Sequence, residues 1–220
     1  MTIKTVLSFI AACCFGAVVF AETAPKFEIV GDTLHYDTER PDGAPDAEID
    51  DEDLDTLRTL LRDNRGITTL EINSAGGDVY AAYEIARVVT DFGLDTVVAK
   101  ECSSACVTVF LAGDGRRMRL GASIGFHQTS WSAASIERYF ERNRERRGWA
   151  TPFEFTSWVY RDTQTEVHSV LEYMVDRGVD PLFAIETIGV ENTDMWFPSR
   201  LRLMAAGVLR DPQAASVPTE

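Results

Sequence analysis

Short apolar segments alternate with helix-like segments between residues 67 and 126, and this alternation limits the fold more than any other feature of the chain. Strands are predicted from the apolar segments at residues 67–72, 96–99, 117–120 and 123–126. Residues 79–92 have the apolar spacing of a helix, and residues 104–112 indicate a buried helix. Because strands that alternate with helices pair in parallel through right-handed crossovers, the sequence predicts an α/β fold with a mostly parallel sheet flanked by helices.

The N-terminal residues 1–21 have the pattern of a secretory signal peptide. Lys4 precedes an apolar run over residues 6–20, and small residues stand at the −3 and −1 positions of a cleavage site after Ala21. The run is shorter than the ~20 residues that span a bilayer, which argues against a retained anchor. We therefore predict cleavage near Ala21 and a periplasmic or secreted protein. A second interpretation takes residues 10–13 as a lipobox with a lipidated Cys13.

The rest of the chain suits one domain, residues 22–210, with a flexible polar tail at residues 211–220. Strand-like pieces at residues 27–30 and 33–36 precede a loop marked by Pro41, Gly43 and Pro45. Further helices are predicted at residues 50–62, 133–147, 152–177, 182–188 and 196–206.

The charge of the chain excludes one class of partner. The formal net charge is −14 at pH 7, and an acidic protein is a poor nucleic-acid binder. Lysine is scarce, since only Lys4, Lys26 and Lys100 occur, and arginine supplies most of the positive charge.

Three segments carry residues suited to acyl-transfer chemistry. Gly76 and Gly77 lie between a predicted strand end and a helix start, where backbone N–H groups can approach an anion. Ser104 begins the predicted buried helix, so its hydroxyl and the N–H of Ala105 can face the same cleft. His127 follows the last predicted strand. Taken singly, Ser104 is more typical of a helix N-cap and His127 of a structural histidine, and a pair of glycines alone is weak evidence for more than a tight turn.

In this order, the three segments resemble the proteolytic subunit of the Clp protease. The Asn-Ser-Pro-Gly-Gly turn of that family is similar to residues 73–77, and its nucleophile segment is similar to residues 103–106. Its Met-Ile-His-Gln segment is similar to residues 125–128. Its Asp-Arg-Phe-Leu segment, which precedes a helix ending in glycine, is similar to residues 194–197 ahead of Gly207.

The resemblance implies a spiral of ββα units, as in the Clp-protease and crotonase folds, and a serine hydrolase acting on a peptide or protein. It implies Ser104 as the nucleophile, His127 as its base and Asp194 as the acid that orients the imidazole. The N–H groups of Gly77 and Ala105 would form the oxyanion hole. Neither a cofactor nor a metal is expected.

Other residues compete for two of these roles. Asp176 and Asp180 are alternative acids to Asp194. A serine-lysine pair is a rival chemistry, but Lys26 lies near the expected new N-terminus, and Lys100 lies on the strand that enters the serine turn.

The chain departs from the family in places that bear on structure and assembly. Cys102 and Cys106 bracket the serine, and two cysteines at this spacing either pair in an oxidising compartment or remain buried thiols. Residues 129–190 do not match the family, so its ring assembly is not implied. A homo-oligomer therefore stays open, and no ATPase partner is expected outside the cytosol.

Two functions of other classes remain as alternatives. One is a catalytically inactive binding or scaffold protein that keeps the fold. The other is a crotonase-type enzyme acting on acyl thioesters, against which the absence of coenzyme A outside the cytosol weighs. The presence of Ser104, His127 and Asp194 at all three triad positions favours the hydrolase, because a scaffold protein does not require all three residues.

Overall fold

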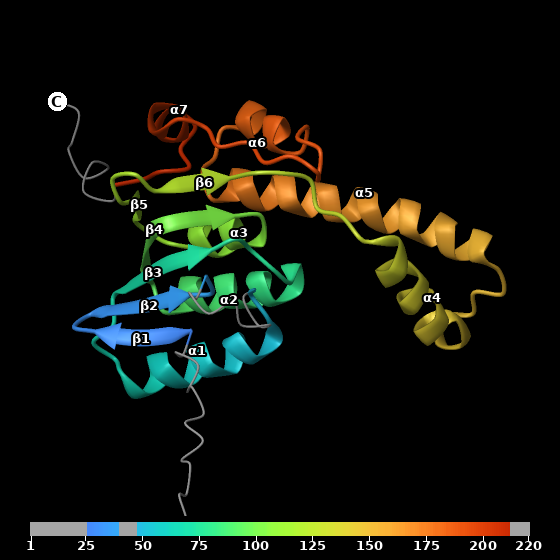
Figure 1. Cartoon of the computed structure of the whole chain (residues 1–220), viewed down its shortest axis with the longest axis horizontal. Helices are drawn as coiled ribbons and strands as arrows, with labels where there is room; N and C mark the ends of the chain where they lie inside the picture. The colour runs from blue at the N-terminus through green and yellow to red at the C-terminus, as the bar shows by residue number, and fades with distance from the viewer. Residues whose placement is uncertain (1–25, 40–47, 212–220) are drawn as a thin grey trace, which may run out of the picture.

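The computed structural model describes residues 26–39 and 48–211 (Figure 1). The strands are β1 (Phe27–Val30), β2 (Thr33–Asp37), β3 (Thr69–Ser74), β4 (Asp95–Ser103), β5 (Arg116–Met118) and β6 (Ser123–Gly125). The helices are α1 (Asp51–Asp63), α2 (Val79–Asp91), α3 (Ala105–Leu111), α4 (Ala133–Arg147), α5 (Pro152–Asp176), α6 (Pro181–Thr187) and α7 (Arg200–Ala205). The predicted signal peptide, the loop at Pro41, Gly43 and Pro45, and residues 212–220 of the predicted tail lie outside the described residues.

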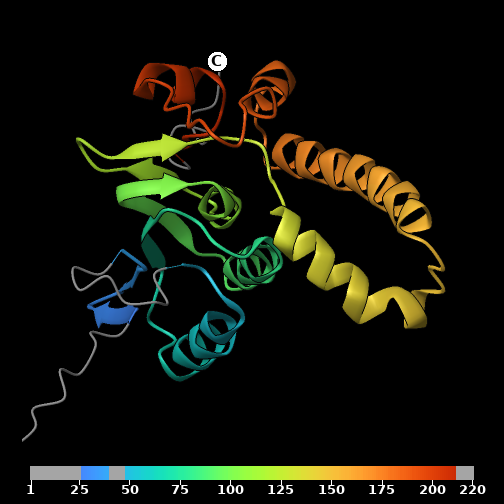
Figure 2. The ribbon, with the colours of Figure 1, turned by 45° about the vertical axis from the view of Figure 1, so that its right-hand side comes forward.

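The six strands form one sheet in which every pairing except that of β1 with β2 is parallel. β4 pairs with two strands in succession, first with β5 along Thr96–Val98 and then with β6 along Glu101–Ser103. Helices α1, α2 and α3 lie on one face of the sheet (Figure 2). The prediction of a mostly parallel α/β sheet flanked by helices is confirmed.

The core lies between the sheet and α2 and α3. It is built from fully buried aliphatic and aromatic side chains, among them Leu34, Ile72, Ile85, Val98 and Phe110. β4 runs four residues beyond the predicted strand at 96–99, because its last residues pair with β3 and β6. This extension carries β4 to Ser103, directly before the candidate nucleophile.

Helices α4 and α5 form an arm that projects from the sheet (Figures 1 and 2). Within α5, which has 25 residues, only Phe155 and Met174 are buried. Near the tip of the arm, stacked and tilted rings hold the two helices together, and these rings belong to Tyr139, Phe140, Trp149, Phe155 and Trp158. The other end of α5 returns to the body of the molecule, beside α6.

The predicted helix at residues 196–206 is wrong in its first part. Trp196 forms an antiparallel bridge to Phe126, with two N–H···O hydrogen bonds of 3.0 Å. The backbone of Trp196 therefore pairs with the residue that follows β6 and cannot be helical. Helix α7 begins only after Ser199, whose side chain accepts a hydrogen bond from the N–H of Arg202. Among the helices of the described chain, none combines the length and the apolar character that crossing a membrane requires.

A buried arginine ties the ends of three segments to the sheet. Arg116 on β5 is 1% exposed, and its guanidinium donates to the carbonyl oxygens of Leu111, Arg177 and Gly207 at 3.1, 2.8 and 2.8 Å. Burial, followed by the nearby charges of Arg177 and Arg210, lowers the pKa of Arg116 to about 10. It therefore remains a cation that satisfies carbonyls at the ends of α3, α5 and α7.

Replacing Arg116 by methionine is expected to lower the free energy of unfolding by about 3 kcal/mol, because three carbonyls in the interior lose their donor. Urea unfolding followed by circular dichroism measures this change. Arg117→Met is the matched control, since Arg117 is its neighbour on β5 and pairs with Asp95 in solvent. That control is expected to cost less than about 1 kcal/mol. Equal losses in the two variants would contradict the structural role of Arg116.

Candidate active site

Ser104 occupies a strained turn between β4 and α3. Its φ of 56° and ψ of −128° make it the one non-glycine residue with positive φ in the described chain. Such a conformation costs about 1–3 kcal/mol and persists only where its surroundings enforce it. Although Ser104 is the N-cap residue of α3, its hydroxyl makes no capping hydrogen bond. Ser104 therefore holds the N-cap position without capping the helix through its side chain, which leaves the hydroxyl available for reaction.

The turn is held on both sides. The N–H of Ser104 donates to the carbonyl of Gly125 on β6 at 3.1 Å. Cys102, which is extended at the end of β4, forms a disulfide with Cys106 in the first turn of α3, and their Cα atoms are 5.3 Å apart. The bond spans Ser104 and braces the backbone that presents its hydroxyl.

Reduction of this disulfide is expected to lower the free energy of unfolding by about 2 kcal/mol, the chain-entropy value for so small a loop. Urea unfolding of the mature protein with and without dithiothreitol measures the change, and a Cys102→Ser/Cys106→Ser variant should not respond to the reductant. Thiol counting on the unreduced, denatured protein is an independent check. Two free thiols would contradict the disulfide.

The Gly76-Gly77 loop lies directly against the Ser104 turn. A Cβ atom at Gly76 would come within 2.9 Å of the Cβ of Ser104 and 3.1 Å of the amide nitrogen of Ala105. A Cβ at Gly77 would lie 2.4 Å from the amide nitrogen of Ile49. Both residues have positive φ, 114° and 143°, which glycine adopts without strain. The paired glycines therefore serve a close backbone approach and not merely a change of chain direction.

Two backbone donors at this place are unused. Ile49 bonds to the carbonyl of Gly76 and the N–H of Asp78, each at 2.8 Å, so the N–H of Gly77 between them points away from Ile49. Within residues 26–39 and 48–211, neither this N–H nor that of Ala105 donates a hydrogen bond. An oxyanion hole requires free N–H groups near the nucleophile. The N–H of Ala105 follows Ser104 directly in the cavity wall, and the loop that carries the N–H of Gly77 contacts the Ser104 turn through Gly76.

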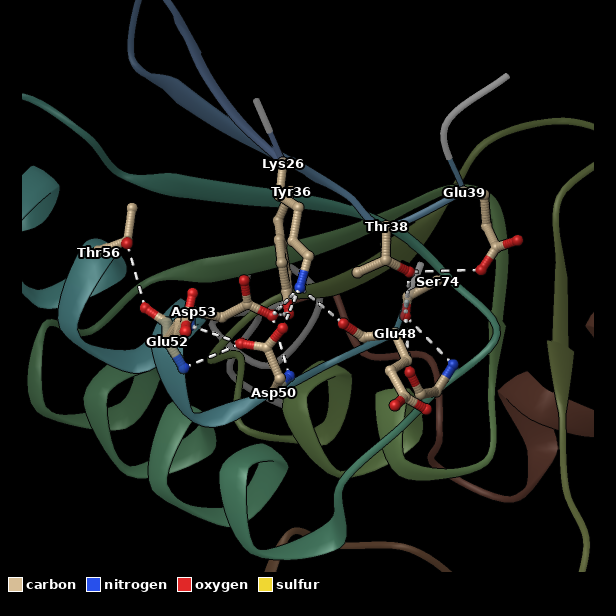
Figure 3. A network of polar contacts seen from close by, with 11 residues as sticks. Lys26, Tyr36, Thr38, Glu39, Glu48, Asp50, Glu52, Asp53, Thr56 and Ser74 are labelled. Carbon is tan, nitrogen blue, oxygen red and sulfur yellow. Dashed lines mark hydrogen bonds and ion pairs between the residues drawn. The ribbon is translucent and has the colours of Figure 1, made fainter. Parts of the chain in front are cut away.

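Side chains of the two residues that follow β2 hold the glycine loop in place (Figure 3). The hydroxyl of Thr38 donates to that of Ser74 at 2.9 Å, and Ser74 accepts from the N–H of Gly76 at 3.1 Å. The carboxylate of Glu39 accepts from the N–H of Ala75 at 2.9 Å. These bonds tie the glycine loop to the end of β2.

Lys26 belongs to a separate cluster that holds the start of α1 (Figure 3). Its ammonium lies 2.6 Å from Asp50 and 3.0 Å from Asp53, and the side chain is 10% exposed. Burial lowers the pKa of Lys26, but the hydrogen bonds and charges of the two aspartates outweigh it and raise the pKa overall. Neither Lys26 nor Lys100 lines the cavity beside Ser104. The structure thus gives no support to a serine-lysine pair.

Ser104, Ala105 and His127 line one cavity of about 360 Å³. Its walls come from α2, α3, α5, the end of α6 and the segment that follows β6, and they are mostly apolar. The apolar side chains of the lining are those of Val79, Val107, Leu111, Phe126, Val167, Val170, Met174 and Ile188. The described residues hold no His, Cys, Asp or Glu cluster arranged for a metal ion.

His127 enters the cavity from a segment that is fixed on either side. Phe126 pairs with Trp196, and the N–H of Gln128 donates to the carbonyl of Val190 at 2.9 Å. The Nδ1 atom of His127 is buried and has no hydrogen-bond partner among the described residues. His127 also makes no hydrogen bond to the hydroxyl of Ser104. The two side chains therefore line the same cavity without being hydrogen-bonded to each other.

The structure does not bring Asp194 to His127. Asp194 is exposed and lines a different hollow, with Glu186 and Trp196. The Phe126–Trp196 bridge aligns His127 with Met195, whose thioether is a poor hydrogen-bond acceptor. This alignment explains why Nδ1 lacks a carboxylate.

The competing acids are not placed better. Asp176 is exposed near the end of α5, and Asp180 caps α6 by accepting from the N–H of Phe183 at 2.9 Å. Neither lines the cavity.

The carboxylate that does line the cavity is that of Glu166 on α5. Sequence reasoning missed it, although Glu166, Val170 and Tyr173 follow one another at helical spacing on one face. A carboxylate in line with apolar residues on a helix was the available signal.

Comparisons with known proteins add one finding about the fold. Neither a protein-family model nor a curated protein matches the chain. Among solved structures, the chain is similar to a single-residue mutant of ClpP1 from Listeria monocytogenes, with 18% identity and a TM-score of 0.48. The match covers 74% of this chain and 84% of that one. The interpretation of the site therefore rests on its own geometry.

Proposed function

We propose that the chain is an exported, ATP-independent serine hydrolase that cleaves peptides or proteins. The observation that carries the proposal is the environment of Ser104. Its hydroxyl, at a positive-φ turn, does not cap α3 and shares a cavity with His127 and Ala105, and the Gly76-Gly77 loop lies against this turn through Gly76. Strained backbone conformations of this kind concentrate at reactive sites.

The proposed mechanism has two half-reactions. Ser104 attacks the carbonyl carbon while His127 accepts its proton, and the N–H groups of Gly77 and Ala105 bind the negative oxygen. His127 then returns the proton to the leaving amine or alcohol, and the acyl group stays on Ser104. A water molecule, deprotonated by His127, releases the acid and restores the serine. Hydrogen bonds of this kind often form only with substrate bound, which accommodates the missing Ser104–His127 contact.

Asp194 as the orienting acid stays a prediction of the sequence, since its carboxylate lies apart from His127. The same holds for export, for which the disulfide and the signal-like residues 1–21 provide support. An exported enzyme meets no ATP, so the proposal includes no unfolding partner. The mostly apolar cavity favours flexible peptide segments over folded protein.

Asp194 is expected to contribute little to turnover. A triad aspartate that bonds the base contributes about 10⁴-fold to kcat, because its loss releases the wrong imidazole tautomer. In this chain Asp194 is exposed in another hollow and Nδ1 of His127 lacks a partner, so Asp194→Asn should lower kcat less than about tenfold. A pH–rate profile for both proteins shows whether the titration of the base shifts. A loss near 10⁴-fold would mean that the segment around residue 194 rearranges during catalysis and completes a triad that the free protein lacks.

One observation favours a second candidate, a catalytically inactive binding protein. An unpartnered Nδ1 leaves the imidazole of His127 without the group that normally fixes its tautomer and orientation. A protein that binds peptides without cleaving them requires no such group.

The two candidates differ in the reactivity of Ser104. The mature protein, from residue 22 onward, is incubated with a fluorophosphonate, digested and analysed by mass spectrometry. We expect one phosphonylated serine, Ser104, and no adduct after heat denaturation. An unmodified Ser104 in the native protein would reject the hydrolase and leave the binding protein.

A further inference from the structure

Glu166 is an uncompensated carboxylate within the proposed substrate cavity. It lines the cavity together with Ser104 and His127, and it is half-buried. Across the described part of the chain, no lysine, arginine or histidine lies within ion-pair distance of Glu166. A carboxylate withdrawn from water without a cation is unfavourable, and a cationic ligand would relieve that cost.

The surroundings of Glu166 shift the pKa of its carboxyl group. Burial, followed by the charge of Asp162, raises the pKa of Glu166, while a hydrogen bond with Thr129 lowers it. Burial and the charge of Glu166 likewise raise the pKa of Tyr83 on α2. Tyr83 and Thr129, the latter two residues beyond His127, line the same cavity as Glu166.

The rest of the lining is suited to an alkyl chain. Between Thr163 and Met174, one side of α5 follows the cavity over about 16 Å, at 1.5 Å per residue. Apart from Glu166, the α5 side chains of this wall are uncharged: Thr163, Val167, Val170, Tyr173 and Met174. An apolar channel with one carboxylate is complementary to a side chain that has a methylene stem and a positive tip.

We propose that Glu166 selects substrates with a lysine or arginine side chain at the residue bound in this cavity. The selection of substrates for cleavage rests on the proposed hydrolase function, but the selective binding of a cationic side chain does not. The hydrolase proposal and the Glu166 proposal can therefore fail separately. A charge-assisted hydrogen bond to Glu166 should favour lysine over the uncharged norleucine by about 10- to 100-fold.

The cleavage test uses peptide amides with a fluorogenic leaving group that differ only in lysine or norleucine before the scissile bond. The measured quantity is the ratio of kcat/KM for lysine to that for norleucine. We expect the ratio to fall at least tenfold in Glu166→Gln. It should stay within twofold of the wild-type ratio in Glu172→Gln, which removes the same charge from an exposed position of α5 outside the cavity.

The binding test does not depend on turnover. Calorimetry compares Nα-acetyl-lysine amide with Nα-acetyl-norleucine amide on Ser104→Ala and on the Ser104→Ala/Glu166→Gln double variant. Tighter binding of the lysine amide that disappears in the double variant supports the proposal even where no hydrolysis occurs. Equal affinities for the two amides, or a preference that survives Glu166→Gln, would overturn it.

Discussion

Replacing Ser104 by alanine is expected to abolish fluorophosphonate labelling and to lower kcat/KM for peptide amides by at least about 10³-fold, because the attacking oxygen is removed. The fold should persist. The hydroxyl does not cap α3, and no hydrogen bond joins it to another described residue, while alanine keeps the Cβ that this turn already accommodates. The change in unfolding free energy should therefore stay within about 0.5 kcal/mol. Labelling, steady-state rates and urea unfolding measure the three quantities.

The adjacent Ser103 supplies the matched control. It is fully buried, and its hydroxyl donates to Glu101 at 2.6 Å, so it is committed to structure. Ser103→Ala should lose about 1 kcal/mol of stability and still be labelled at Ser104. Labelling that survives in Ser104→Ala, or that is lost only in Ser103→Ala, would assign the nucleophile to a different residue.

Most elements of the fold are predictable because local signals in the sequence agree with tertiary packing. The bounds predicted for α4 match the structure to the residue, since Ser132 caps its start and Gly148 ends it in the left-handed conformation. Helix α5 likewise starts with Thr151 and Glu154 in a capping box. Signals of this kind depend on a few neighbouring residues, so they can be identified in a single sequence.

The errors occur where distant pairing or a change of chain direction decides the structure. The helix predicted over residues 79–92 ends one residue early, at Asp91, and Phe92 is 42% exposed at its C-cap, where the chain turns away. Residues 196–199 are predicted to begin a helix but are not helical, because Trp196 pairs with Phe126 in an antiparallel bridge and α7 starts only at Arg200. Backbone pairing across such sequence separations leaves no local signature.

The candidate site is also only partly predictable, because some of its residues lie in short recognisable segments and others are positioned by distant pairing. The order of the matching segments indicates that Ser104, Ala105 and His127 lie close together, and these three residues do line one cavity. The choice of acid depends on a short match at residues 194–197, and a shift of one position in an extended pairing places a side chain on the opposite face. Glu166 lies in a region without resemblance to the family, and the path of α5 brings it to the cavity that Ser104 also lines.

His127 is expected to be the second essential group. Replacement by alanine should lower kcat by about 10²- to 10⁴-fold, the usual contribution of a positioned general base. His168→Ala is the control, since His168 lies on the exposed side of α5 with a loose contact of 3.9 Å to Glu172. Its kcat should match that of the wild-type protein. A His127→Ala variant that keeps its kcat would exclude this residue as the base.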